Sequence, residues 1–429
     1  MFYRCYIERF KAPIHLHILI VPSWYRASKA DTQGSFFREQ AFALYKAGHQ
    51  VGIVHPQHRS MRQWQSTFTG KYGFDIEDDN GIPTLRMHTM TWFPRQIPYL
   101  NYWLWVRNGI ALYEAYVSRY GAPDVVHAHA TLYGGLLAWT IQQRYQIPFA
   151  ITEHGTAYAR NLFAPWELKM AAKAVAAADA RLAVSEAFCQ EISRFIGSQW
   201  QPCANVVPES FTTYPLALTK QAKATEINET KPFVFTTVAY LSVRKGIHHL
   251  ITAFASAFGG DKTARLKIGG DGGERDRLEA LAAELNISDQ VVFLGALDRE
   301  AVREAIAQTD VFVLASQYET FGVVVIEALA LGKPVIATRC GGPNQVVQSQ
   351  DGLLIEPENV PALTQALQHM RDRADEYDAK TIRQNCIARF GEQALVDRLL
   401  PIYEEISGLQ DRTQSRTQNN AAKDLAPYA

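Results

Sequence analysis

Cysteine is scarce and scattered in this sequence of 429 residues. There are five cysteines, an odd number, and no two of them form a C-x-x-C pair. A disulfide framework needs paired cysteines, and a zinc site needs closely spaced ones. The sequence therefore disfavours both and is typical of a protein of the reducing cytosol. The cysteines are Cys5, Cys189, Cys203, Cys340 and Cys386.

An excess of charge of either sign is also missing. Lysine plus arginine and aspartate plus glutamate both total 43, which gives a formal net charge of zero. A dedicated nucleic-acid-binding protein would show a basic excess. We therefore expect no nucleic-acid partner, although a local basic patch is compatible with this balance.

Long apolar runs are absent as well. No stretch reaches the roughly 18 uncharged apolar residues that a bilayer-spanning helix needs. The apolar run at 14–21 is interrupted by His15 and His17, and no small-residue cleavage site follows it, so it does not resemble a signal peptide. We expect a cytoplasmic protein that is soluble or in peripheral contact with the inner face of the membrane.

The length exceeds what a single core usually supports, so we expect two domains. Apolar strand patterns alternate with helical ones, as in 16–21, 34–47 and 51–54, which predicts an α/β fold with doubly wound sheets. Ligands of such sheets bind beyond the carboxyl ends of the strands, so Gly34 lies where the backbone could approach one. A simple turn is the alternative for Gly34. No G-x-G-x-x-G follows the first strand, which disfavours a dinucleotide dehydrogenase.

The most informative stretch runs from 311 to 338 and reads as strand, turn, helix, strand. Its helix is expected to begin after Gly322, where the unpaired backbone N–H groups and the helix dipole favour an anion. Glu319 in the preceding turn would accept hydrogen bonds from hydroxyl groups but not from phosphate. A ligand with phosphate at one end and hydroxyls nearby fits both features, as a sugar nucleotide does.

Two further sets of residues fit a ligand site at the carboxyl ends of the strands. Arg244 and Lys245 occupy a strand-to-helix turn in the second half, which favours an anion site over the alternative of a solvated basic turn. His127 and His129 lie on one side of an expected strand, and His154 ends the next strand. A single buried histidine is usually structural, but histidines at successive strand ends favour a position in the cleft.

Glu319 and Glu327 belong to the pattern E-x-F-G-x4-E-A-x-A-x-G-x-P-V-I-A-T. This pattern resembles the signature of glycosyltransferase family 4, whose members are retaining transferases of the GT-B fold. The resemblance covers roughly residues 15–405 and is more specific in the second half than in the first. It implies two Rossmann-like doubly wound domains that face each other across a cleft. The alternative is an ordinary strand–helix–strand unit with a surface glutamate.

The resemblance also implies roles for individual residues. Glu319 and His129 would be catalytic, with Glu319 on the sugar hydroxyls and His129 near the reacting carbon. Glu327 would bind the ribose, Gly295 would read the nucleobase through its backbone, and His154 would contact the sugar or the acceptor. The positions implied to bind the donor are Gly34, Arg244, Lys245, Gly295, Phe321, Gly322 and Glu327.

Domain boundaries follow from the same patterns. We place the acceptor-side domain at 14–213, a polar linker at 214–231 and the nucleotide-sugar-binding domain at 232–385. We expect a closing helix at about 379–408, whose part at 386–408 crosses back to the first domain. We expect the tail at 409–429 to be disordered.

The sequence departs from the family pattern at two places. Tyr240 stands where an arginine is common, and Arg244 is the candidate to replace its charge. Pro208-Glu209-Ser210-Phe211 stands where the family usually has Pro-Asn-Gly. This difference means that the family's contact between the domains does not carry over directly to this sequence.

Two segments of the first half have competing interpretations. Residues 57–101 are expected to be irregular. The acidic run at 75–80 resembles a metal-binding D-x-D motif, but Gly81 and Pro83 follow it directly, so we favour a solvated turn. The aromatic run at 99–107 fits a core helix or a membrane-interface face, and we favour the core.

We therefore predict a retaining glycosyltransferase that needs neither a metal nor another cofactor. It would move a sugar from a nucleotide-diphosphate sugar to a saccharide or lipid-linked acceptor in surface polysaccharide or glycolipid assembly. Three alternatives remain: a sugar-nucleotide epimerase, a phosphorylase with pyridoxal phosphate, and a non-catalytic sugar-nucleotide sensor. Glu319 and Glu327 do not fit a retaining glycosidase, because eight residues of helix separate them by about 12 Å and such carboxyls lie about 5 Å apart.

Overall fold

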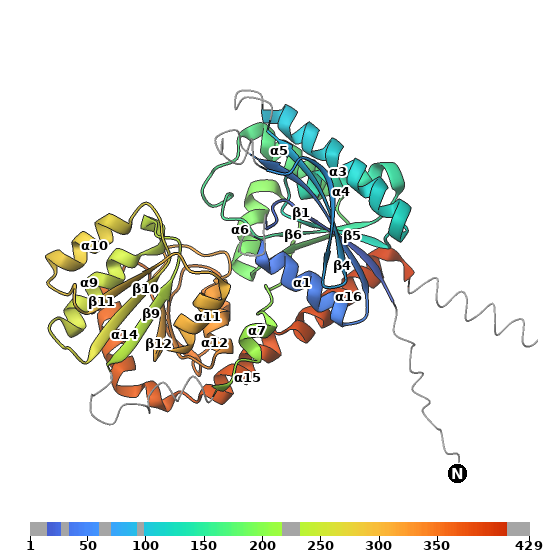
Figure 1. Ribbon diagram of the computed structural model, residues 1–429. Coiled ribbons are helices and arrows are strands. Elements are labelled where there is room, and N and C mark those ends of the chain that lie inside the picture. Colours follow the sequence, from blue (N-terminus) through green and yellow to red (C-terminus); the bar gives the residue numbers. More distant parts are fainter. Residues whose placement is uncertain (1–14, 27–33, 60–69, 92–97, 217–231, 410–429) are drawn as a thin grey trace, which may run out of the picture.

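Two α/β halves make up the structure, a computed structural model that describes residues 15–26, 34–59, 70–91, 98–216 and 232–409 (Figure 1). Each half contains one largely parallel sheet flanked by helices. The predicted fold class, two Rossmann-like halves, is confirmed. Most of the predicted linker and all of the tail after 409 lie outside the described residues.

The first sheet has eight strands in the order β3-β4-β2-β1-β5-β6-β7-β8. Its strands are β1 (His17–Pro22), β2 (Gln50–Arg59), β3 (Gly73–Asp79), β4 (Ile82–Met90), β5 (Val125–His129), β6 (Phe149–Glu153), β7 (Ala180–Ala183) and β8 (Gln201–Pro202). The helices of this half are α1 (Ser35–Lys46), α3 (Pro98–Tyr120), α4 (Gly134–Tyr145), α5 (Pro165–Ala177), α6 (Glu186–Ile196) and α7 (Glu209–Thr212). β1 pairs in parallel with β2 on one side and with β5 on the other. The sheet therefore grows in one direction from β1 to β2 and in the other direction from β5 to β8. This order creates a switch point where ligands of such sheets bind.

The second sheet has six strands in the order β11-β10-β9-β12-β13-β14. They are β9 (Phe233–Val238), β10 (Ala264–Gly269), β11 (Val291–Gly295), β12 (Val311–Leu314), β13 (Val335–Thr338) and β14 (Gly352–Ile355). The associated helices are η1 (Val243–Lys245), α9 (Ile247–Phe258), α10 (Arg275–Glu284), α11 (Arg299–Ala307), α12 (Val323–Ala330), α13 (Pro343–Val346), α14 (Val360–Arg373) and η2 (Ala374–Glu376). Its strands pair in parallel, and β9 lies between β10 and β12.

The segment 73–90 forms a regular hairpin, so the expectation of irregular structure there was wrong. β3 pairs antiparallel with β4 at the edge of the first sheet. The turn between them uses Asn80 and Gly81, both with positive φ, as a two-residue hairpin turn requires. The acidic run is part of this hairpin. Asp79 is ion-paired with Arg26 and Arg38, and Asp78 accepts a hydrogen bond from the Gly81 N–H.

Burial explains why three consecutive valines begin α12. The side chains from Val325 to Ala330 are all buried, and the two valines before them are partly buried against the same core, so packing overrides the weak helix propensity of valine. Gly332 then ends the segment with φ of 68°. A Cβ at Gly332 would lie 2.6 Å from the backbone oxygen of Ala379, so only glycine fits there.

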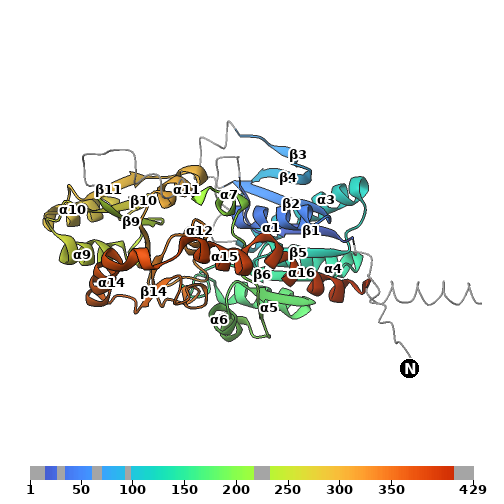
Figure 2. The ribbon, with the colours of Figure 1, turned by 90° about the horizontal axis from the view of Figure 1, so that it is seen from below.

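The chain returns to the first half through two helices, where we expected one. α15 (Ala379–Phe390) and α16 (Glu392–Ser407) are separated by extended backbone at Gly391. α15 packs against α12, and α16 packs against α1 and β5. Figure 2 shows α14, α15 and α16 following one another from the second half to the first. Leu399 and Tyr403 of α16 are buried in the same cluster as β1 and α1.

The aromatic run at 99–107 lies in α3 and divides between core and surface. Tyr102 and Trp105 are buried, as the favoured interpretation required, whereas Tyr99 and Trp103 are more than half exposed. Within the described ranges, no helix has the length and apolar character needed to cross a bilayer.

Candidate active site

Glu319 lies in the turn between β12 and α12 and is held on several sides. Its carboxylate Oε1 accepts hydrogen bonds from Lys245 Nζ at 2.6 Å and from Ser316 Oγ at 2.7 Å. Its backbone N–H donates to Cys340 O at 2.9 Å, and its backbone oxygen accepts from the Gly342 N–H. The side chain is 12% exposed. The structure thus brings together Glu319 and Lys245, which are far apart in the sequence.

The start of α12 offers an approachable backbone. Gly322 is the N-cap residue, with φ of 89°, and no side chain caps the helix. Gly342 packs so closely on this turn that a Cβ there would lie 2.2 Å from Phe321 Cα. Val325 N donates to Gly322 O at 2.9 Å, whereas the N–H groups of the two valines before it come too early in the helix to have an intrahelical acceptor. This is a favourable place for an anion.

Arg244 and Lys245 are positioned by η1, the short helix after β9. The backbone oxygen of Arg244 accepts a hydrogen bond from Gln317 N at 2.8 Å, which ties this turn to the turn of Glu319. Arg244 Nη1 is buried and has no hydrogen-bond partner among the described residues. Tyr240 is 70% exposed, so the position where the family commonly has arginine is open to solvent.

Glu327 lies on α12 and is fully buried. Arg299 of α11 forms an ion pair with its Oε1 at 2.5 Å. Burial raises the pKa of the Glu327 carboxyl, and the charge of Arg299 opposes that rise. Arg299 also lies over the ring of Phe211 in α7, which connects this ion pair to the junction between the halves. Because Glu327 is fully buried, its carboxylate is not open to a ribose in this structure.

The other residues implied to bind the donor lie in different settings. Phe321 is buried, with its ring edge-on to Phe390 of α15, so its side chain fixes the turn within the core. Gly295 ends β11 with φ of 73°. Gly34 caps α1 in a left-handed conformation, and a Cβ there would lie 3.0 Å from Trp24 O. The preceding residues 27–33 are outside the described part.

The histidines form a buried cluster at the carboxyl ends of β5 and β6. His129 Nδ1 and His154 Nε2 are 3.0 Å apart and share a hydrogen bond. Phe37 of α1 stacks on the His129 ring. Burial lowers the pKa of His129 well below its ordinary value, so the ring is neutral. Among the described residues, His129 Nε2 has no partner.

The two halves meet directly at the Glu319 turn. Thr320 Oγ1 donates to His154 O at 3.1 Å, and Ser185 Oγ donates to Thr320 O at 2.7 Å. Tyr318 donates its hydroxyl to Glu191 of α6. The turn therefore lies against the carboxyl ends of β6 and β7, in the cleft expected from the fold.

Sequence reasoning missed some of these contacts. Ser185 is the N-cap of α6 and accepts from Phe188 N. Its bond to Thr320 gave no sequence signal, because it depends on how the halves face each other. No described group of three or more His, Cys, Asp or Glu residues could hold a metal ion.

Comparison with known proteins adds two family matches. Residues 219–385 match the family described as "Glycosyl transferases group 1", and residues 33–204 match "Glycosyltransferase Family 4". The putative teichuronic acid biosynthesis glycosyltransferase TuaC of Bacillus subtilis is 27% identical over 369 residues, which cover 82% of this chain and 88% of TuaC. D-inositol 3-phosphate glycosyltransferase of Corynebacterium jeikeium is 28% identical over 66% of this chain and 72% of its own.

Solved structures show the same fold at low sequence identity. Sucrose-phosphate synthase from Thermosynechococcus elongatus superposes with a TM-score of 0.72 at 22% identity, covering 92% of this chain and 100% of that one. Anabaena Alr3699/HepE in complex with UDP gives a TM-score of 0.67 at 18% identity, covering 91% and 100%.

Proposed function

The chain belongs to glycosyltransferase family 4, group 1, and from this membership we propose that it transfers a sugar from a nucleotide-diphosphate sugar to an acceptor hydroxyl with retention of the anomeric configuration. The observation that carries the proposal is the Lys245–Glu319 pair beside the open start of α12. A cation and unpaired backbone N–H groups suit a diphosphate. A carboxylate next to them suits the hydroxyls of the attached sugar.

Each part of the site has a defined task in this proposal. Departure of the diphosphate builds negative charge, which Lys245, Arg244 and the α12 start would stabilise without a metal. Lys245 would exchange part of its contact with Glu319 for phosphate oxygens, leaving Glu319 to accept from sugar hydroxyls. The neutral His129 would present its unpartnered Nε2 to the sugar or the acceptor, with His154 holding the opposite nitrogen.

The acceptor and pathway are also proposed, from weaker support. TuaC is named for teichuronic acid biosynthesis, and LpsE of Rhizobium meliloti, 33% identical over 37% of this chain, is named for lipopolysaccharide core biosynthesis. We infer a saccharide or lipid-linked acceptor in assembly of a surface polysaccharide or glycolipid. A sugar-nucleotide epimerase would instead convert the donor without any acceptor, and a sensor would bind it without turnover.

Replacing Glu319 by Ala tests the proposal. A thermal-shift screen of UDP-, GDP- and ADP-sugars first identifies the donor, and nucleotide release with an acceptor panel then measures turnover. We expect Glu319→Ala to lower kcat about a hundredfold or more while the melting temperature stays near that of the wild type. Glu376→Ala, which removes an exposed carboxylate of η2, is the matched control. Unchanged turnover in Glu319→Ala would refute the role of this carboxylate.

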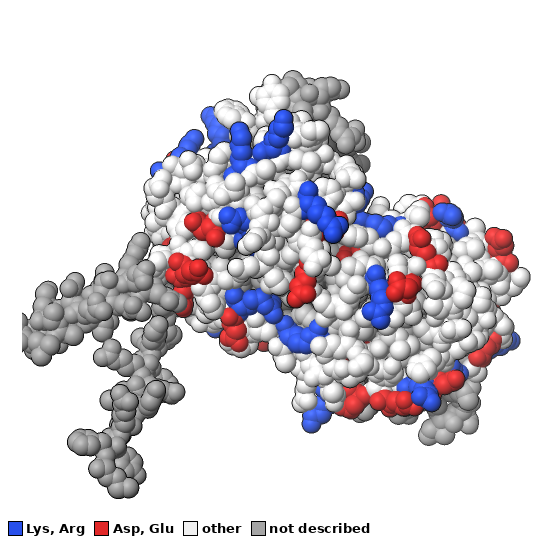
Figure 3. Space-filling view, turned by 180° about the vertical axis from the view of Figure 1, so that it is seen from behind, with Lys and Arg blue, Asp and Glu red and all other residues white. Residues whose placement is uncertain are grey.

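We also propose peripheral membrane contact through the amino-terminal part of α3. Tyr99, Trp103 and Arg107 recur every four residues along its exposed side, and aromatic rings with cations suit a membrane interface. Lys and Arg gather at the upper end of the first half in Figure 3, the end that carries α3 and α5.

Cosedimentation with vesicles tests this contact. We expect the protein to sediment with vesicles of phosphatidylcholine and phosphatidylglycerol in equal parts, and less with pure phosphatidylcholine. Trp103→Ala should reduce the bound fraction several-fold, because Trp103 is 57% exposed and its loss leaves the core intact. Tyr45→Ala, an exposed aromatic on α1, serves as the control. A wild-type protein that stays in the supernatant with both vesicles would exclude the contact.

A further inference from the structure

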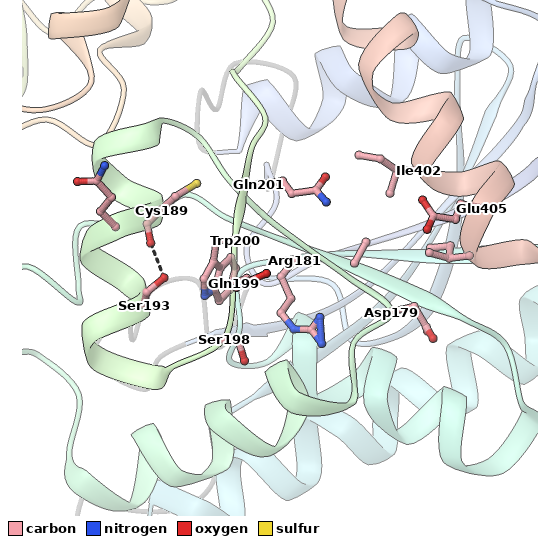
Figure 4. Close-up of a pocket in the computed structure, with 13 residues that line it drawn as sticks. Asp179, Arg181, Cys189, Ser193, Ser198, Gln199, Trp200, Gln201, Ile402 and Glu405 are labelled. Carbon is pink, nitrogen blue, oxygen red and sulfur yellow. Dashed lines mark hydrogen bonds between the residues drawn. The ribbon is translucent and has the colours of Figure 1, made fainter.

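A pocket lies in the first half, at the opposite end of β7 from the cleft. Its volume is about 620 Å³. Figure 4 shows its walls: the amino end of β7 with Asp179 and Arg181, the helix α6, the segment 198–201, and the end of α16 with Ile402 and Glu405. The carboxyl end of β7 leads instead to Ser185, which contacts Thr320 in the cleft. The pocket is therefore separate from the donor site but shares α6 with it.

The polar lining of this pocket has unused hydrogen-bonding capacity. Four of its side chains are exposed and have no hydrogen-bond partner in the described part of the chain: Gln190, Gln199, Gln201 and Glu405. Two other lining residues are already engaged. Asp179 accepts from Phe149 N, and Arg181 Nε donates to Val175 O at 2.9 Å. These three amides and one carboxylate come from three parts of the fold: α6, the segment 198–201 and α16.

The composition of the lining selects one class of ligand. Arg181 is the single cation among the lining residues, which also include the two carboxylates Asp179 and Glu405, and this balance disfavours an anion. The unpartnered amides disfavour a purely apolar ligand, because burying them unpaired costs free energy. A neutral polyhydroxyl molecule matches this lining, because its hydroxyl groups can donate to the carboxylate and can both donate to and accept from the amides. Trp200, Ile402 and Ile406 supply an apolar wall for the C–H faces of sugar rings.

We propose that this pocket is a non-catalytic binding site for a neutral saccharide, where a distal segment of the glycan acceptor is held while its growing end lies in the cleft. The proposal rests on the proposed transferase function. A second attachment point on the same acceptor raises its effective concentration at the cleft without any new contact there.

Calorimetric titration with three neutral trisaccharides tests the site: maltotriose, cellotriose and chitotriose, each in the presence of saturating UDP. We expect at least one to bind the full-length protein. Gln190→Ala combined with Glu405→Ala should weaken that binding about tenfold or more, because two hydrogen-bonding side chains are lost. Both side chains are exposed and unpartnered, so the fold should be unaffected.

The matched control replaces an exposed glutamine and an exposed glutamate elsewhere, Gln143→Ala with Glu284→Ala, and should bind the trisaccharide like the wild type. Absence of binding by all three trisaccharides, or equal binding by the pocket variant, would overturn the proposal. So would inorganic phosphate competing for the site. Titration with UDP, GDP and ADP in the absence of saccharide reports on the cleft alone. Loss of nucleotide binding with retained saccharide binding would therefore count against the donor proposal and leave the pocket standing.

Discussion

At the scale of single residues, Arg244 offers the charge that Tyr240 lacks. Its Nη1 is buried without a partner in the described residues, while Lys245 beside it is already bound to Glu319. A buried guanidinium nitrogen without an acceptor is costly, and a diphosphate oxygen would satisfy it. The sequence suggested this replacement, and the structure supplies the orphaned donor as a physical reason.

Arg244→Ala should therefore weaken nucleotide binding. A hydrogen bond to a charged group contributes about 1.5–3 kcal/mol, so we expect the dissociation constant for UDP, or for whichever nucleotide binds, to rise at least about tenfold. Adding Tyr240→Arg to this variant should restore part of the affinity, because position 240 is exposed beside the same turn. Isothermal titration calorimetry measures both. Equal affinity in wild type and Arg244→Ala would show that Arg244 does not contact the phosphates.

Other residues show where reasoning from sequence ends. The sequence pattern identified Glu319, Phe321 and Glu327 together, but it did not show that the three side chains lie in different environments. Glu319 is anchored by Lys245 in the cleft, Phe321 is part of the core, and Glu327 is covered by Arg299. Arg299 lies outside that sequence pattern. Its partner depends on the packing of α11 on α12, which one sequence does not reveal.

At the scale of elements, strands and helices with strong patterns were predictable. β12, α12 and β13 occur in the predicted order of strand, helix and strand within the stretch 311–338. The edge hairpin β3–β4 was missed because its outer strand is largely exposed and carries little apolar signal. The break at Gly391 was missed because a lone glycine in a helical pattern is commonly tolerated.

The buried histidines at the carboxyl ends of β5 and β6 should make the stability of the fold depend on pH. Burial lowers the pKa of His127 and His154 to about 3, from an ordinary value of 6.5. The unfolded chain binds protons on these rings below about pH 6.5, and the folded chain does not until about pH 3. Their contribution to the free energy of unfolding is thus complete above pH 6.5 and falls as the pH drops towards 3. At pH 5 the loss is about 2 kcal/mol per histidine.

Urea denaturation at pH 7.5 and pH 5 measures this loss. Glu153 next to the cluster acts in the opposite direction, since burial raises its pKa, so the comparison of variants is more informative than the total. His154→Asn should reduce the difference in stability between the two pH values by about 2 kcal/mol. His369→Gln, at an exposed site on α14, should leave it unchanged. An identical difference in wild type and His154→Asn would contradict the assignment.

At the scale of the whole molecule, the two halves are joined in two different ways. α15 and α16 form a long packed connection, and Lys46 of α1 binds both Glu209 and Glu392 near the junction. The hydrogen bonds at the Glu319 turn include Ser185 with Thr320, Thr320 with the backbone oxygen of His154, and Tyr318 with Glu191. A packed connection through α15 and α16, together with polar contacts between the halves at the Glu319 turn, suits a hinge that closes over a ligand.

Tyr318→Phe tests this closure, because it removes one hydroxyl that bonds across the cleft and leaves the ring in place. A hydrogen bond to a charged group contributes about 1.5–3 kcal/mol, so the balance between closed and open forms should shift about tenfold or more towards open. Small-angle scattering of the ligand-free protein should then give a larger radius of gyration. The donor KM should rise, because only the closed form completes the site. Tyr120→Phe on α3, remote from the cleft, should match the wild type in both measurements. If Tyr318→Phe also matched it in both, the bond to Glu191 would have no part in closure, and the shape of the cleft would depend on the packing of α15 and α16 alone.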